Sequence, residues 1–145
     1  MKNNKCFITR GNDQWATPSN IYNLFVRSGM FEDFNPLCED YDDSLKKVFN
    51  CNLFCNPPFS NIEPFVDYML NHYKKGYHVV MLLPVRSGTK WFYKLFTNSN
   101  IHIYFFTQRL HFNDSKSAPF DCMLVMLHLA YDKRFYFCNR ELEMI

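Results

Sequence analysis

The stretch that decides the fold reads Leu53-Phe54-Cys55-Asn56-Pro57-Pro58-Phe59. Its apolar start is typical of a short buried strand. The two prolines end that strand abruptly, because proline lacks an N–H and fixes φ. An amide side chain, a proline carbonyl and an aromatic ring therefore stand together at the carboxyl end of the strand. In open α/β sheets, ligands bind outside this end.

Residues 56–59 suit one chemical task, which is to hold a planar substrate that carries an NH2 group. The side-chain oxygen of Asn56 and the carbonyl of Pro57 can both accept hydrogen bonds from amine protons. Such acceptors stabilise the positive charge that develops when the amine acts as a nucleophile. The ring of Phe59 can stack on a base. The alternative is a plain strand-to-loop turn without chemistry.

Apolar periodicity predicts an α/β sheet around this stretch, mostly parallel with an antiparallel C-terminal edge. An amphipathic helix should connect Phe54 to residues 80–83 on a neighbouring central strand. Residues 120–129 and 134–138 lie close enough in the chain to form an antiparallel pair. The expected helices are 17–29, 62–75 and 89–96, and the other expected strands are 30–34, 77–84, 101–106 and part of 110–112.

Composition indicates one domain, residues 1–145, with 48% hydrophobic residues for its core. The net charge of +2 is too small to indicate nucleic-acid binding by itself. No signal peptide precedes the six cysteines, so we expect reduced thiols in a cytoplasmic protein, or in host cytoplasm if the source is viral. Cys51, Cys55 and His72 have no recognised zinc spacing, and no apolar run has membrane-spanning length.

Four short motifs follow one another between about residues 13 and 129. They are Trp15-Ala16-Thr17-Pro18, Asn56-Pro57-Pro58-Phe59-Ser60, the run from Leu82 to Phe92, and Gln108-Arg109-Leu110-His111-Phe112 with Ser117-Ala118-Pro119-Phe120. In this order the set resembles the phage-type DNA N6-adenine methyltransferases, a compact Dam-like family. The individual motifs are short, and their joint order and spacing make the match specific.

The resemblance implies a Rossmann-like fold that uses S-adenosylmethionine to methylate an adenine flipped out of DNA. It implies catalytic roles for Asn56, Pro57, Pro58 and Phe59. It places Trp15, Thr17, Pro18, Asn35 and Pro36 at the cofactor. It directs Arg86, Lys90, Trp91 and Arg109 toward the substrate, although Trp91 taken alone is also typical of a core anchor.

One position departs from the family pattern. Asn35 stands where the family usually carries Asp, so the charge that would hold the methionine ammonium group is missing. The chain has four glycines, and none forms a Gly-rich cofactor turn. We therefore expect weaker cofactor binding than in a relative with Asp. The alternatives are an inactive methyltransferase-like protein that binds a nucleotide or DNA, and a methyltransferase acting on RNA or on a protein glutamine.

Overall fold

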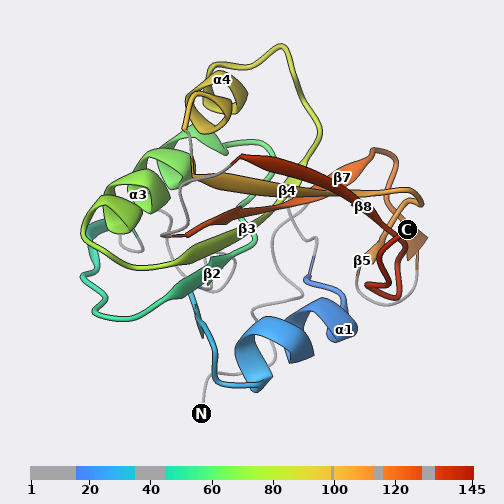
Figure 1. The fold of residues 1–145 in the computed structure, drawn as a ribbon, viewed down its shortest axis with the longest axis horizontal. Coiled ribbons are helices and arrows are strands. Elements are labelled where there is room, and N and C mark those ends of the chain that lie inside the picture. The colour runs from blue at the N-terminus through green and yellow to red at the C-terminus, as the bar shows by residue number, and fades with distance from the viewer. Residues whose placement is uncertain (1–15, 35–44, 99, 113–115, 129–132) are drawn as a thin grey trace.

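A six-stranded sheet forms the centre of the molecule (Figure 1). The structure is a computed structural model, and it describes residues 16–34, 45–98, 100–112, 116–128 and 133–145. The strands of the sheet are β1 (Glu32–Asp33), β2 (Leu53–Cys55), β3 (Val79–Pro84), β4 (Ile101–Phe106), β7 (Cys122–Leu127) and β8 (Arg134–Cys138). A separate two-stranded ribbon pairs β5 (His111–Phe112) with β6 (Lys116–Ser117).

Five strands of the sheet run in one direction and β7 runs against them. The order across the sheet is β1-β2-β3-β7-β4-β8, and β7 pairs antiparallel with both β3 and β4. The expected α/β class, mostly parallel and antiparallel in the C-terminal part of the chain, is confirmed and is consistent with a Rossmann-like methyltransferase fold. The expectation for Phe54 is also confirmed, because it lies beside Val80 on the neighbouring parallel strand.

The expected pairing of the last two strands is wrong. β8 pairs in parallel with β4, with Tyr136 beside Tyr104, so β4 separates it from β7. Burial gives the physical reason. All residues of β7 except Met126 are buried, and such a strand gains most from a neighbour on each side. β8 exposes Phe135 and Phe137, a pattern that suits the edge of the sheet.

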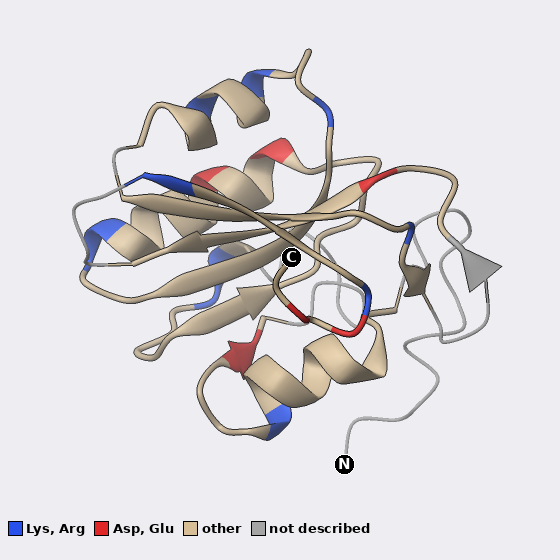
Figure 2. Ribbon diagram, turned by 45° about the vertical axis from the view of Figure 1, so that its right-hand side comes forward, with Lys and Arg blue, Asp and Glu red and all other residues tan. Residues whose placement is uncertain are grey.

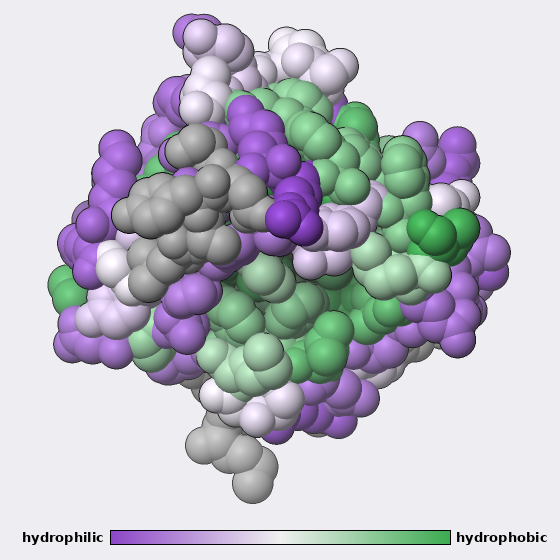
Figure 3. All heavy atoms as spheres, viewed as in Figure 1, coloured by the Kyte–Doolittle hydropathy of each residue, from purple (hydrophilic) through white to green (hydrophobic). Residues whose placement is uncertain are grey.

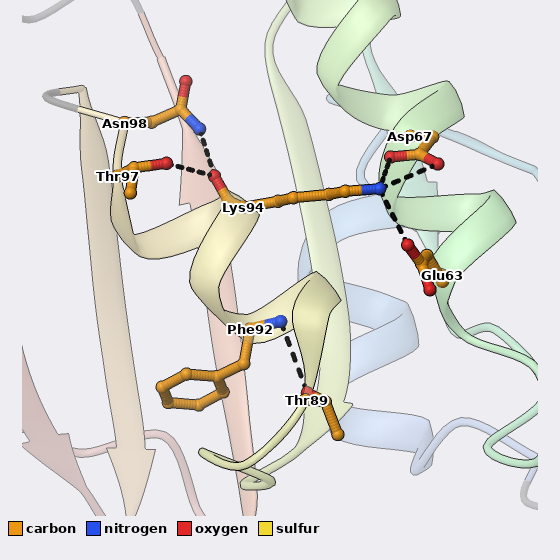
Figure 4. Close-up of polar contacts among 7 residues, drawn as sticks. All are labelled: Glu63, Asp67, Thr89, Phe92, Lys94, Thr97 and Asn98. Atoms are coloured by element: carbon orange, nitrogen blue, oxygen red, sulfur yellow. Dashed lines mark hydrogen bonds and ion pairs between the residues drawn. The ribbon is translucent and has the colours of Figure 1, made fainter.

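Two helices cover one side of the sheet, and a third helical segment lies on the other side (Figure 1). The helix α3 (Glu63–Lys74) has a proline in its first turn and buries Phe65, Val66 and Met69. The helix α4 (Lys90–Phe96) begins after Thr89, whose Oγ1 accepts a hydrogen bond from the Phe92 N–H. Figure 4 shows how the two helices are joined: Lys94 Nζ lies 2.8 Å from Glu63 Oε1 and 2.9 Å from Asp67 Oδ1.

The helix expected over residues 17–29 is divided. It begins as α1 (Ser19–Tyr22), continues as the π-helical segment η3 (Asn23–Arg27), and ends near Gly29, whose φ of 82° is the left-handed conformation that glycine adopts easily. Phe25 stacks on Phe54, with ring centroids 5.8 Å apart. Beside this contact an apolar hollow of about 210 Å³ opens between η3 and the strands, visible as the green depression in Figure 3.

One continuous apolar core holds both sides of the sheet together. Cys51, Cys55, Cys122 and Cys138 are free thiols, as expected, while Cys6 and Cys38 lie outside the described residues. Within the described ranges, none of the helices has the length and apolar character needed to span a bilayer.

Candidate functional site

The predicted motifs gather where the parallel strands end. β2, β3 and β4 point the same way, so their carboxyl ends lie along one edge of the sheet. Asn56 directly follows β2, Arg86 lies two residues beyond β3, and Arg109 lies three residues beyond β4. This edge is the usual ligand side of an open α/β sheet.

Asn56 joins the predicted catalytic motif to the predicted cofactor element. Its side chain is 4% exposed, and its Nδ2 donates a hydrogen bond of 3.1 Å to Thr17 Oγ1. Pro18, Pro57 and Pro58 are buried around this contact, and Thr17 is half-buried. The bond occupies the donor end of the amide, and it thereby fixes Oδ1 as the end that accepts hydrogen bonds.

The ring of Phe59 is enclosed by two other rings. It is 3% exposed, and its centroid lies 5.2 Å from that of Phe120 and 5.8 Å from that of Phe112, both in edge contacts. A base can stack on Phe59 only after one of these neighbours has moved. The stacking role of Phe59 therefore stays a prediction, and it now requires a rearrangement that the sequence did not indicate.

Arg86 holds the same loop from the neighbouring strand. Its Nη1 donates a hydrogen bond of 2.7 Å to the backbone carbonyl of Phe59. Its guanidinium carbon lies 6.0 Å from the centroid of the Phe120 ring, in reach of a cation–π contact. Arg86 thus contacts the backbone of Phe59 and the ring of Phe120. This is the geometry of a residue that positions the loop containing Phe59.

The other residues assigned to the substrate differ in their placement. Lys90 and Arg109 are exposed. Trp91 is 5% exposed and packs in the core beside Phe92, so it cannot contact DNA in this conformation. Trp15, Asn35 and Pro36 lie outside the described residues. Sequence reasoning gave no role to Phe112 and Phe120, although both belong to motifs of the resemblance.

Cys55 and Cys122, two of the thiols at this edge, stay protonated at neutral pH. Burial, with a smaller effect of Asp33, raises the pKa of Cys55 well above its ordinary value. Burial, and then Asp121, raises the pKa of Cys122 to about 12. A thiol must ionise to act as a nucleophile, so neither cysteine is suited to covalent chemistry here.

Charge and cavities do not mark the site by themselves. Figure 2 shows lysines and arginines spread over many elements instead of gathered on one face. A cavity of about 610 Å³ lies at the opposite edge of the sheet, where Glu32, Cys51 and Tyr77 stand at or before the amino ends of the strands. The site is therefore defined by the contact of Asn56 with Thr17 and by the cluster of three rings formed by Phe59, Phe112 and Phe120.

The sequence of this chain matches the model of a known protein family. The family described as DNA N-6-adenine-methyltransferase (Dam) matches residues 7–135, which is most of the chain. The matched range includes Thr17, Asn56, Arg86 and Phe120. No curated protein and no solved structure shows a significant match to the chain.

Proposed function

Because the chain belongs to the DNA N-6-adenine-methyltransferase (Dam) family, we propose that it transfers a methyl group from S-adenosylmethionine to the exocyclic nitrogen of an adenine flipped out of DNA. The observation that carries the proposal is the hydrogen bond between Asn56 and Thr17. It supports the proposal because methyl transfer requires the residues around the donor and those around the acceptor to be adjacent.

The described residues fit the cofactor that the family implies. Thr17 and Pro18 reach the carboxyl edge of the sheet, and Thr17 contacts the residue assigned to the substrate amine. When bound, S-adenosylmethionine supplies an electrophilic methyl group on a sulfonium. Trp15, Thr17, Pro18, Asn35 and Pro36 are the residues that would hold it.

Asn56 is proposed to polarise the target amine. The adenine amine is a poor nucleophile, because its lone pair is delocalised into the ring. Asn56 Oδ1 and the Pro57 carbonyl would accept hydrogen bonds from its two protons, so that the lone pair regains sp3 character and the developing positive charge is stabilised. The nitrogen would take the methyl group as the bond from that methyl to the sulfonium sulfur breaks, which leaves S-adenosylhomocysteine, and the acidified amine would then lose one proton to water. No strong general base is required.

Phe59 is proposed to stack on the flipped base once its ring is uncovered. Phe112 comes from the β5–β6 ribbon and Phe120 from the segment before β7, so both lie on connections between strands of the sheet. Arg86 would keep the Phe59 backbone in place while these neighbours move. Base capture then opens an aromatic contact that is closed in the free protein.

Transfer of tritium from labelled cofactor to mixed-sequence DNA, followed by nucleoside analysis, tests the proposal. We expect labelled N6-methyladenine from the wild type. In Asn56→Ala the rate should fall by about a hundredfold or more, the usual cost of losing one preorganised acceptor or donor. The matched control is Asn71→Ala, since Asn71 is an exposed asparagine in the last turn of α3, outside the motif.

Two results would contradict the proposal at different points. If the wild type binds the cofactor but labels no DNA, the DNA assignment is wrong, and RNA or a protein glutamine becomes the better substrate. If Asn56→Ala keeps full activity, the role of residues 56–59 is wrong even though the enzyme class is right.

A further inference from the structure

A small polar groove lies beside the candidate site. Its volume is about 260 Å³, and it is formed by three segments that are far apart in the sequence. Pro18 and Asn20 come from the start of α1, Leu110 and His111 from the entry to β5, and Arg140 with Glu141 from the turn after β8. Pro18 follows Thr17, which contacts Asn56, so the groove begins one residue from the proposed catalytic contact.

Hydrogen bonds fix Arg140 in the groove. Its carbonyl accepts a bond of 2.6 Å from Asn20 Nδ2, and its backbone N–H donates to Gln108 Oε1 at 3.4 Å. Its side chain reaches the ring of His111, where Nη1 contacts Nε2. The backbone and the guanidinium of this arginine are therefore both held by segments that line the groove.

The contact with His111 leaves donors available for an anion. A guanidinium can only donate, so Nε2 of His111 accepts, and Nδ1 carries the ring proton. Among the described residues, Arg140 makes no ion pair with a carboxylate, and its remaining N–H groups are not used by any described side chain. Glu141 lines the same groove without pairing with Arg140.

The size of the groove limits its occupant. Sites for drug-sized ligands and cofactors measure about 300–1,000 Å³. A groove of about 260 Å³ is thus smaller than a site for a whole nucleotide or for S-adenosylmethionine. It suits one compact anionic group. A phosphodiester fits this description, and arginine is well suited to bind it because its planar fork of N–H groups matches phosphate oxygens.

We propose that Arg140, oriented by His111, binds a backbone phosphate of DNA next to the target nucleotide. The inference rests on the proposed function for the identity of the ligand. A phosphate in this groove positions the strand that enters the site through Pro18 and Thr17. Because phosphate contacts position DNA without reading its sequence, the contact serves any recognition sequence.

The test measures binding of a fluorescent mixed-sequence duplex by anisotropy, without cofactor, between about 50 and about 200 mM salt. In Arg140→Gln we expect about tenfold weaker binding at low salt and a slope of log K against log[salt] that is smaller by about 1. Arg27→Gln is the matched control, since it removes the same charge from an exposed arginine at the end of η3. It should change neither the slope nor the affinity.

Two further variants separate phosphate binding from a loss of folding. Glu141→Gln removes a negative charge that would repel the phosphate in the groove, so it should tighten DNA binding by roughly threefold. His111→Gln removes the ring that orients Arg140, so the affinity for DNA should fall. It keeps the charge of Arg140, so the slope of log K against log[salt] should stay unchanged. A misfolded protein cannot give effects of opposite sign in Arg140→Gln and Glu141→Gln.

The outcomes distinguish the sources of the anion and the two proposals. If Arg140→Gln loses affinity for S-adenosylhomocysteine in calorimetry and keeps the DNA slope, the groove binds the cofactor carboxylate, and the inference is wrong. Equal slopes for Arg140→Gln and Arg27→Gln, in a protein that methylates DNA, overturn the phosphate site alone. A slope that depends on Arg140, in a protein that transfers no methyl group, supports the phosphate site and overturns only the proposed function. A wild type that binds no DNA overturns both.

Discussion

The amide of Asn56 is oriented by a residue that lies 39 positions earlier in the chain. That distance matters because Asn56 lies between two rigid constraints, the end of β2 before it and the prolines after it, and neither determines how its side chain is rotated. The hydrogen bond to Thr17 supplies the missing constraint. A side chain that must present its oxygen to a substrate gains from having its nitrogen held.

Thr17→Val removes this hydrogen bond and keeps the shape of the side chain. We expect the rate of methyl transfer to fall about fivefold, because a net hydrogen bond is worth about 1 kcal/mol and the amide loses its orientation. Thr17→Ser restores the hydroxyl and should recover most of the rate. The measurement is single-turnover methyl transfer at saturating cofactor. Equal rates for the valine and serine variants would show that the contact does not position Asn56.

Phe59→Leu separates stacking from packing at the residue scale. Replacing the ring with an aliphatic side chain should weaken base capture by about 1–3 kcal/mol, the usual contribution of a base–aromatic stack. The loss of stability should be smaller than the roughly 3–5 kcal/mol typical of Phe→Ala in a core. Phe112→Leu is the matched control from the same cluster.

Substrate KM and the free energy of unfolding are measured for both leucine variants. If stacking belongs to Phe59, only Phe59→Leu raises the KM, while both variants lower the stability. An equal rise of KM in both would assign the effect to the packing of the cluster.

At the scale of elements, apolar periodicity located most helices and strands but not all their neighbours. β4 and β8 match their predicted ranges, and α3 differs from its range by one residue at each end. The position of β7 inside the sheet was missed, because a fully buried run does not reveal which strands flank it. The π-helical segment η3 was missed because it preserves an apolar face at nearly helical spacing.

Lys94 connects α4 to α3 through two carboxylates one turn apart. Its hydrogen bond lowers the pKa of Glu63 below its ordinary value of 4.5. A carboxylate whose pKa is depressed by folding stabilises the native state above its unfolded pKa, and this contribution is lost as the pH falls through the folded pKa. The contribution is modest, because all three side chains are partly exposed.

Lys94→Gln should therefore lower the melting temperature at pH 7 and low salt, since Glu63 and Asp67 then repel each other across one turn. The difference from wild type should shrink in high salt and also as the pH falls through the folded pKa of Glu63, which lies below its ordinary value of 4.5. Thermal melts over a pH and salt series provide the measurement. Lys75→Gln, at the end of α3, is a control that removes a charge outside the cluster. A difference that persists in acid would assign the loss to packing.

At the scale of the whole molecule, the site depends on topology more than on any single motif. The sequence could indicate that residues 17–18 and 56–59 act together, because the family resemblance implied it. It could not indicate that Phe112 and Phe120 enclose Phe59, since that contact depends on the order of β3, β4 and β7 in the sheet. Arg140 belongs to none of the motifs found in the sequence. Its place in the groove depends on where β8 ends.

Ligand binding at this edge should stabilise the entire chain, because one core spans both sides of the sheet. We expect S-adenosylhomocysteine at a hundred times its Kd to add about 2.7 kcal/mol to the free energy of unfolding. For a chain of this length the melting temperature should then rise by about 5–10 °C in a single transition. Asn35→Asp restores the missing negative charge, so at equal ligand concentration its shift should be larger than that of the wild type.

Differential scanning calorimetry with and without the ligand provides the measurement. Two transitions, of which only one moves, would contradict the single domain of residues 1–145. An unchanged melting temperature in the wild type together with a clear shift in Asn35→Asp would show that the chain retains the site and has lost affinity through that one residue. If neither protein shows a shift, the cofactor assignment in the proposal is wrong. A ligand that binds only the folded chain must raise its free energy of unfolding.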